Sequence, residues 1–437
     1  MATRRWMGAA APVKDVYTLA LSGTWTAADT ITLTINNVDF TLTLGTTVTT
    51  TTIATAMKQA FNGETLTDTT YSYSPNLSSG AQSIGLFTEL VASVSASTVT
   101  FTGVTAGVPI TITAARVTAS SGAISFTHAT TATGPSYWDN QDNWSGNTVP
   151  VNNDDVVFDS GNVDLKYALS TSIQPATVAI TQGYTGKIGL PDLNPATSDT
   201  TAYAEYRTKF LTFSNNSVTN SVTIGTGDGT GSGRIKIDFG AGQTTLLVVN
   251  SGGRAVQGEP AIVVKGTHAS NAFTVNNGDV GFGFAIGDTT TVATLRVGTD
   301  QSSNAKVLCG TACTVTTVVM SGGSLTVNSS LTTLTQYAGT VSQLTGVPAT
   351  LRVWGGVYEL RSTGTIATEC TVGSSGKLDR SKDTRSLTIT PAVQLFSKSQ
   401  FLDPNASLTL TAGFKCNGCR LGDCVVEVGS GRTFTVA

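Results

Sequence analysis

A glycine that recurs at nearly regular spacing is the feature that most constrains how this chain can fold. Between positions 320 and 380 the sequence reads MSGGSLTV, QYAGTVSQL, VWGGVYEL and GSSGKLDR, so a glycine precedes a short apolar/polar alternation four times. These glycines are Gly323, Gly339, Gly356 and Gly376, and the spacings between them are 16, 17 and 20. A unit of this length buries its apolar face only by stacking on its neighbours.

The repeat predicts the coils of a β-solenoid. Each unit is too short for a propeller blade and lacks helical periodicity. We expect glycine to form the tight corner of each coil and alternate apolar residues to point into a narrow core. The residues expected to point inward include Leu325, Val327, Val341, Leu344, Val357, Leu360 and Leu378.

The composition favours an all-β protein. Charged residues make up only 12% of the 437 residues, and the chain contains 46 glycines. Thr and Val, which are abundant, favour strands, and glycine favours turns. The length predicts more than one domain. We therefore expect a small N-terminal β-domain with one helix, followed by a β-solenoid body similar to a parallel β-helix.

Residues 1–13 carry the basic and aromatic side chains of Arg4, Arg5 and Trp6. We expect this segment to be a docking arm that anchors the protein, and a floppy tail is the alternative. The apolar run after the arginines is short and is broken by glycine and proline, whereas a secretory signal usually needs a longer apolar core. No apolar stretch in the chain is long enough to predict a transmembrane helix.

A small β-rich domain is expected over residues 14–130. Two of its strands are predicted on either side of Asn36 and Asn37, because asparagines favour the tight turn of a hairpin. Residues 51–61 change to helical spacing and predict the one helix of the chain. Gly63, just after this segment, is typical of a helix end.

A linker and a cap are expected over residues 131–170, ahead of a solenoid over residues 171–437. Trp138 and Trp144 are expected to plug the open end of the solenoid, where unpaired strand edges need a cover. A calcium site is an alternative, because calcium takes several oxygen ligands. We favour the interpretation that the acidic side chains bond the loop backbone, and we predict no metal site. The carboxylates concerned are Asp139, Asp142, Asp154, Asp155, Asp159 and Asp164.

The six cysteines all lie in the last third of the chain and leave three interpretations open. A thiolate zinc site is one, although the spacing lacks a paired pattern. One or more disulfides are another. We favour free buried thiols that pack as small hydrophobic residues, and we predict no cofactor. The cysteines are Cys309, Cys313, Cys370, Cys416, Cys419 and Cys424.

Charge and histidine content argue against several classes of function. The chain has 25 basic and 28 acidic residues, a net charge of −3 and no basic run, so nucleic-acid binding has little support. His128 and His268 are the only two histidines, which argues against most acid/base and metal enzymes. The glycine-rich run over 224–238 lacks the Gly-Lys-Ser/Thr of a phosphate loop and predicts tight turns.

A polysaccharide-cleaving enzyme is the catalytic alternative that a β-solenoid suggests. Such an enzyme needs two carboxylates about 5 to 10 Å apart in a groove. Adjacent coils would bring Glu359 near Asp379 or Asp383. Two arginines, Arg380 and Arg385, lie close by in the sequence. Acids are few in the repeat, so we predict no catalytic residue and expect no enzyme activity. The aromatic candidates for lining a groove are Trp354 and Tyr358.

Several segments resemble structural proteins of tailed bacteriophages. They are the start, MATRRWMGAAAPVKDVYTL, the end of the small domain, AGVPITIT, and the later segments YWDNQDNWSGNTVPVNNDDVVFDSGNVDL, TQGYTGKIGLP, EYR and GSGRIKID. The resemblance covers most of the chain, and its motifs are structural. It implies a virion component such as a head decoration, a head fibre or a tail protein, and it carries over no catalytic residues.

The expected function is therefore that of a structural component displayed on the surface of a bacteriophage virion, with capsid decoration or a head fibre favoured over the tail. The expected partners are a major capsid or tail protein and further copies of the chain in a homotrimer, with neither nucleic acid nor membrane. The alternative is a tail fibre or tailspike-like protein that binds a host surface glycan, with or without depolymerase activity. A bacterial surface-layer protein or adhesin is a third hypothesis.

Overall fold

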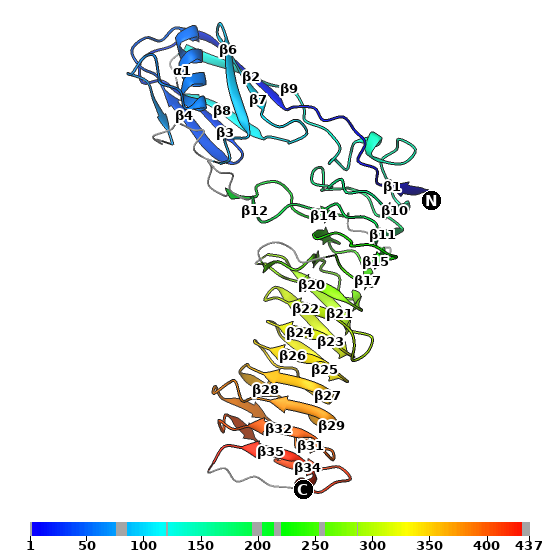
Figure 1. The fold of residues 1–437 in the computed structure, drawn as a ribbon. Coiled ribbons are helices and arrows are strands. Elements are labelled where there is room, and N and C mark those ends of the chain that lie inside the picture. Colours follow the sequence, from blue (N-terminus) through cyan, green and yellow to red (C-terminus); the bar gives the residue numbers. More distant parts are fainter. Residues whose placement is uncertain are drawn as a thin grey trace.

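The computed structural model consists of a small β-domain and a long body of stacked coils, as Figure 1 shows. It describes residues 2–75, 85–118, 121–194, 203–213, 220–252, 258–285 and 287–430. The predicted fold class is confirmed: within these ranges the chain is almost entirely β-structure with one α-helix, and the body is a parallel β-solenoid.

The small domain contains two four-stranded antiparallel sheets around one hydrophobic cluster. One sheet consists of β6 (Leu90–Ser95), β7 (Thr98–Gly103), β2 (Val16–Thr24) and β9 (Ser121–Thr130). The other consists of β5 (Ser72–Ser74), β4 (Val38–Thr43), β3 (Thr30–Ile35) and β8 (Ile112–Thr118). Asn36 and Asn37 form the predicted hairpin turn between β3 and β4, with φ angles of 51° and 67° that a tight two-residue turn needs.

The helix α1 (Thr50–Asn62) covers β6, β7 and β2 of the small domain. Its first turn is closed by Thr49, whose side chain accepts from the backbone N–H of Thr52 while the Thr52 hydroxyl bonds back to Thr49. Gly63 ends the helix in the left-handed conformation at φ 70°. The apolar face that the helical spacing predicted is buried against the sheet.

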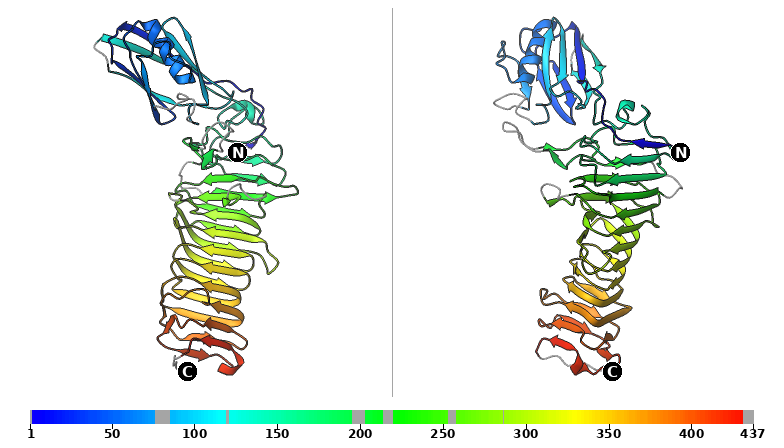
Figure 2. Two further views of the ribbon diagram at one scale, coloured as in Figure 1. Left: turned by 60° about the vertical axis from the view of Figure 1, so that its left-hand side comes forward. Right: turned by 45° about the vertical axis from the view of Figure 1, so that its right-hand side comes forward.

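The body is built from two columns of parallel strands, so each coil contributes one strand to each column. Figure 2 shows these coils stacked into a straight rod. The first column comprises β1 (Thr3–Arg5), β10 (Asp155–Phe158), β11 (Thr177–Thr181), β15 (Asn220–Thr226), β17 (Thr244–Val248), β19 (Ala272–Val275), β21 (Thr290–Val297), β23 (Cys313–Met320), β25 (Leu331–Gln336), the first halves of β27 (Thr350–Leu360) and β29 (Glu369–Asp379), β31 (Val393–Leu395) and β34 (Phe414–Cys416).

The second column lies on the opposite side of the core. It comprises β14 (Leu211–Thr212), β16 (Ile235–Asp238), β18 (Ile262–Lys265), β20 (Gly278–Phe282), β22 (Ala305–Cys309), β24 (Ser324–Val327), β26 (Thr340–Gln343), the second halves of β27 and β29, β32 (Gln400–Asp403) and β35 (Val425–Val428). Later coils add a third short column of β28 (Gly364–Ile366), β30 (Leu387–Ile389) and β33 (Leu408–Leu410). A separate short pair is β12 (Leu193–Asn194) with β13 (Tyr203–Ala204).

The four glycines of the repeat lie in one column at a corner of the body. Pairing of β24 with β26 and of β26 with β27 places Gly323, Gly339 and Gly356 one above another, and Gly356 is paired directly with Gly376. The first three have φ angles of 75°, 81° and 78°, a backbone conformation that residues other than glycine rarely adopt. Gly376 has no such φ angle, but a Cβ there would collide with a backbone carbonyl of the preceding coil.

The core differs from the predicted pattern at two positions. Gln343 and Tyr358 point inward, whereas Leu344 and Val357 are only partly buried. The alternation in β26 starts at Val341, so its next inward position is Gln343, and register places Tyr358 over Val341. The buried amide of Gln343 is satisfied, because its Nε2 donates to two backbone carbonyls at 2.7 and 3.1 Å.

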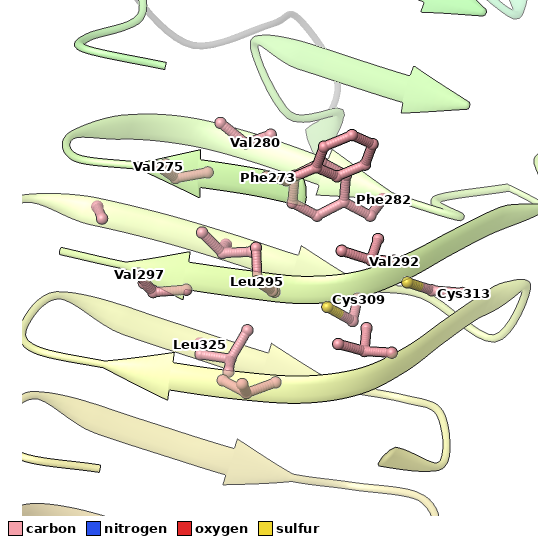
Figure 3. Close-up of a cluster of buried hydrophobic side chains, with 14 of the residues drawn as sticks. Phe273, Val275, Val280, Phe282, Val292, Leu295, Val297, Cys309, Cys313 and Leu325 are labelled. Atoms are coloured by element: carbon pink, nitrogen blue, oxygen red, sulfur yellow. The ribbon is translucent and has the colours of Figure 1, made fainter. Parts of the chain in front are cut away.

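Stacked apolar side chains fill the narrow space between the two columns. Phe273 and Phe282 stack with ring centroids 5.2 Å apart, and Val, Leu and Cys side chains from successive coils continue the same layer, as Figure 3 shows. Because the strands are parallel, inward-facing residues of one coil lie over inward-facing residues of the next, as Val341 and Tyr358 do.

The body starts earlier in the chain than the predicted boundary at residue 171. Its column already includes β10, and the N-terminal strand β1 adds the outermost strand by pairing parallel with β10. The cap segment is therefore interleaved with the first coils instead of preceding them. The strands of the small domain run from Val16 to Thr130, inside the predicted range of 14–130.

Candidate functional site

The N-terminal segment that was expected to be a docking arm is part of the body. Arg4 and Arg5 lie in β1, and their side chains pair with Asp154 (Nε to Oδ2, 3.2 Å) and with Asp159. Trp6 is buried, and its indole N–H donates to a backbone carbonyl of the cap at 3.1 Å. The edge of β10 offers unpaired backbone groups beside two carboxylates, which explains why the segment folds back. Neither a free arm nor a floppy tail describes it.

Three tryptophans close the N-terminal end of the body, and we call Trp6, Trp138 and Trp144 the tryptophan plug. Trp144 is completely buried and lies edge-on to the other two, with ring centroids 5.1 Å from Trp6 and 4.7 Å from Trp138. Its indole N–H donates to the carbonyl of Trp138 at 2.7 Å, so no polar atom of the ring is left unpaired. The plug rests on Phe158 of β10.

The carboxylates of the cap bind backbone and basic side chains. Asp154 accepts from the backbone N–H groups of Ala2 (2.9 Å) and Val151 (3.2 Å) and from Arg4. Burial opposes ionisation of Asp154, but these hydrogen bonds outweigh it and lower its pKa. Asp155, Asp159 and Asp164 also have protein partners. Within the described ranges, no three His, Cys, Asp or Glu side chains gather so as to hold a metal ion.

The acids considered for a catalytic pair are held in ion pairs. Glu359 accepts from Lys382 Nζ at 2.6 Å, and Asp383 pairs with Arg385 at 2.8 Å. Burial favours the neutral forms of Glu359 and Asp379, but hydrogen bonds from lysines outweigh it and lower both pKa values. The hydrogen bond from Arg385 lowers the pKa of Asp383. A general acid needs a raised pKa, so this cluster has the electrostatics of a structural network.

Arg380 has a structural position between coils. Its side chain is fully buried, and its guanidinium donates to Ser407 Oγ (2.7 Å), to the carbonyls of Leu360 (3.1 Å) and Ser362 (2.9 Å), and to the carbonyl of Arg385. Burial lowers its pKa. Because these partners come from three successive coils, Arg380 ties the coils together.

The two histidines have different surroundings. His128 is exposed at the surface, where it lies 2.7 Å (Nε2 to Oδ1) from buried Asp15 and stacks on Tyr17 at 4.0 Å between ring centroids. Asp15 also accepts two backbone N–H groups, at 2.6 and 2.8 Å, so the pair organises the base of the small domain. His268 accepts from the backbone N–H of Ser270 at 3.1 Å, as a turn residue does.

The junction between the small domain and the body contains a buried charge network that sequence patterns did not indicate. Arg207 of the body pairs with Glu89 of the small domain and with Glu205. Tyr203 and Tyr206 also donate to Glu89, and the guanidinium lies 4.3 Å from the Tyr206 ring centre. Burial alone would lower the pKa of Arg207, but the surrounding tyrosine and carboxylates raise it. The two parts are therefore joined through side chains as well as through the linker.

A cavity of about 780 Å³ opens beside this network. Its walls come from both parts of the chain, and they include Asn37, Pro109, Tyr137, Lys166, Tyr206 and Arg207. Tyr137 is buried, its hydroxyl has no hydrogen-bond partner within the described ranges, and burial raises its pKa. The cavity therefore places aromatic side chains beside the paired guanidinium of Arg207.

An exposed aromatic column follows the corner beside the glycines, and we call Tyr337, Trp354 and Phe396 the aromatic ladder. The register of β25, β27, β29 and β31 places Tyr337, Trp354, Gly373 and Phe396 at equivalent positions of successive coils. Tyr337 is 53% exposed and Trp354 is 37% exposed. A Cβ on Gly373 would lie 2.6 Å from the Trp354 ring, so the glycine leaves room for Trp354 to approach Phe396, 5.3 Å away.

The cysteines form two groups with different exposure. Cys309, Cys313 and Cys370 are buried in the core, where Figure 3 shows the first two side by side. Cys416, Cys419 and Cys424 are partly buried in the last turns of the body. All six are free thiols in this structure.

Comparison with known proteins gives no information on function. Searches among protein families, curated proteins and solved structures found no match for this chain. The structure's described part also has no helix of the length and apolarity that crossing a membrane requires.

Proposed function

We propose that this chain is a structural component of a bacteriophage virion, displayed on the particle surface as a capsid decoration or head fibre. The observation that carries the proposal is the continuous rod: parallel coils in register, plugged by tryptophans at one end and carrying a separate β-domain beside that end. Such a body gives length and stiffness.

The distribution of charge supports a structural role. The acids that a glycan-cleaving site would use, Glu359, Asp379 and Asp383, are paired and have lowered pKa values. Arg380, which lies between them, is buried and bonds to backbone carbonyls. We accordingly propose that the protein is not an enzyme and that its partners are other virion proteins.

Attachment to the particle is proposed to involve the small domain, because the N-terminal segment is occupied within the body. Arg4, Arg5 and Trp6 pair with the cap and with β10, which leaves the small domain as the free unit at this end. We further propose a homotrimer with the rods side by side. Light scattering of the purified protein should give three times the chain mass of 44.9 kDa, and a monomer would contradict the trimer.

The composition of the particle tests the main proposal. Mass spectrometry of gradient-purified virions from the phage that encodes this chain should find peptides of the protein at a constant ratio to the major capsid protein. A ratio that falls through successive purification steps would contradict the proposal, because a bound contaminant washes away and a structural component does not.

The second candidate function is binding of a host surface glycan, and the aromatic ladder is the observation that favours it. Aromatic rings occupy three of four successive coils, with Gly373 in the remaining one, and they form an apolar strip in which Tyr337 and Trp354 are exposed and Phe396 is partly buried. Beside the strip, Arg352 is neutralised by Glu369 at 2.8 Å, so the strip suits a neutral polyhydroxylated ligand better than an anion. Aromatic residues of this kind dominate the energetics of many binding surfaces.

The ladder can be tested apart from the virion role. Calorimetric titration with oligosaccharides from the host envelope should show binding that Trp354→Ala and Tyr337→Ala each weaken at least tenfold. Val151→Ala is the matched control, because Val151 is equally exposed, at 53%, but lies in the cap. Absence of binding by the unaltered protein would remove this candidate, and new reducing ends in the sugar would instead indicate depolymerase activity.

A further inference from the structure

The C-terminal end of the body gathers half of the cysteines of the chain into one turn. Cys416 ends β34, Cys419 follows it, and Cys424 comes directly before β35, after the short 3-10 helix η4 (Leu421–Asp423). Their side chains are partly exposed, unlike those of the three core cysteines. Cys424 also packs against the edge of the hydrophobic core.

The turn brings two of the sulfur atoms together. Cys419 Sγ lies 3.9 Å from Cys424 Sγ, and both thiols face the preceding coil, 3.5 Å and 3.3 Å from the carbonyl oxygens of Leu395 and Phe396. A disulfide needs sulfur atoms about 2.05 Å apart, so the two partly exposed thiols must approach each other further, by rotation about their Cα–Cβ bonds.

The backbone of the turn is already fixed. Asp423 Oδ2 accepts from the backbone N–H of Arg420 at 2.8 Å, and the N–H groups of Asp423 and Cys424 donate to the carbonyls of Arg420 (2.9 Å) and Leu421 (3.0 Å). The two cysteines are therefore held near each other by contacts that do not involve sulfur. This is the preorganisation that favours a short-range crosslink.

We propose that Cys419 and Cys424 form a disulfide bond once the protein meets an oxidising medium, and that this bond closes the last coil of the body. The last strand, β35, pairs with β32 on one side only among the described residues, and Val425 at its start is 53% exposed. A coil with one neighbour opens more readily than a coil with two. A crosslink in its turn restrains this last described coil.

The bond forms by thiol–disulfide exchange with a small-molecule disulfide such as oxidised glutathione. The Cys424 thiolate attacks one sulfur of glutathione disulfide, which gives a mixed disulfide and releases one glutathione thiolate. The Cys419 thiolate then attacks the Cys424 sulfur and releases the second glutathione thiolate. The protein loses two electrons and two protons, and both are taken up by the two glutathione molecules.

The buried cysteines provide an internal comparison. The hydrogen bond with Cys313 and burial raise the pKa of Cys309, and burial raises the pKa of Cys370 to about 12. Because both side chains are completely buried, we expect an oxidant not to reach either thiol while the protein is folded. Burial and the neighbouring Cys424 thiol also raise the pKa of Cys419, to about 11, so exchange should quicken as the pH is raised.

The positions of lysine and arginine make the crosslink easy to detect. Trypsin cleaves after Lys415, Arg420 and Arg432, so Cys419 and Cys424 fall on separate peptides, 416–420 and 421–432. The full-length protein is treated with oxidised glutathione, alkylated in denaturant, digested without reductant and analysed by mass spectrometry. The expected result is one linked pair of these peptides, which reductant separates.

Single substitutions identify the partners. Cys416→Ser should retain the linked pair, Cys424→Ser should abolish it, and Cys309→Ser should leave it unchanged. Loss of the link in Cys416→Ser would assign the bond to Cys416 and overturn the proposal, as would a bond confined to peptide 416–420. Full alkylation of all three thiols after oxidant, or stoichiometric zinc in the untreated protein, would overturn it as well.

Discussion

The two ends of the solenoid body differ in how the outermost coil is covered and held in place. At the N-terminal end, the tryptophan plug covers the first coil, and β1 adds a strand from a distant part of the sequence, since Arg4 pairs with Val156. At the C-terminal end, the last described coil has a small aromatic contact between Phe401 and Phe414, 5.1 Å apart, and a turn containing three cysteines.

This difference indicates which contacts stabilise each end of the body. The tryptophan plug buries much apolar surface, but it depends on long-range contacts. Trp6 and Trp144 are in contact although the whole small domain lies between them in the sequence. A local turn forms at once but buries little apolar area. We therefore infer that the end beside the small domain is the fixed end and that the opposite end opens first.

Removing the plug should have the largest effect. Trp144→Ala deletes a completely buried ring with two tryptophan neighbours, and we expect it to lower the free energy of unfolding by about 3–5 kcal/mol. Urea titration followed by circular dichroism measures the change. The matched control is Trp354→Ala, which removes an exposed ring and should cost less than about 1 kcal/mol. Equal costs would mean that the plug does not stabilise this end.

A substitution in the middle of the body distinguishes the contribution of coil stacking from that of the two ends. Gly356→Ala meets both a left-handed φ of 78° and the carbonyl of Gly339 on the neighbouring coil, so we expect a loss of roughly 3 kcal/mol. Gly227→Ala has a similar φ of 77° with open space around it and should cost only about 1–2 kcal/mol. The thermal midpoints of the two variants give the contribution of coil stacking, and identical midpoints would argue against it.

Oxidation should act at the C-terminal end alone. Closing the short loop between Cys419 and Cys424 is expected to stabilise the last coil by about 2 kcal/mol, which slower hydrogen exchange in β35 would report. Exchange in β10, at the plugged end, serves as the reference and should not change with oxidant. A uniform change along the body would show that the crosslink has no local effect.

Acid should loosen the plugged end through Asp154. Its pKa is lowered in the folded protein, so its contribution is complete above the unfolded value of 3.8 and is lost as the pH falls through the folded pKa. We expect about 1 kcal/mol, seen as less protection of β1 from hydrogen exchange once rates are corrected for pH. In Asp154→Asn the protection should already be low at pH 7 and should not decline further.

Much of the body was predictable because equivalent residues of successive coils are separated in the sequence by the length of one coil. The spacings of 16, 17 and 20 between the four glycines are the same spacings that pair Gly356 with Gly376 and β24 with β26. The helix and the hairpin at Asn36 were predictable for a different reason, since each depends on the geometry of a few neighbouring residues.

The remaining features depend on which distant segments meet, and no local pattern reports that. Trp6 looked like part of a free arm because its partner, Trp144, is far away in the sequence. The ion pair between Arg207 and Glu89 joins two parts of the chain, and neither residue stands in a motif. The inward position of Tyr358 depended on where the alternation restarts after the corner at Gly356.

The central claim is that the chain is a rod on the virion surface, held at the end beside the small domain. Gold-labelled antibodies against the small domain and against the turn around Cys419 measure it directly on intact particles by electron microscopy. The account predicts both labels on the head, with the small-domain label closer to the shell than the label at the C-terminal end. Particles that carry neither label, with the protein found only free in the lysate, would contradict it.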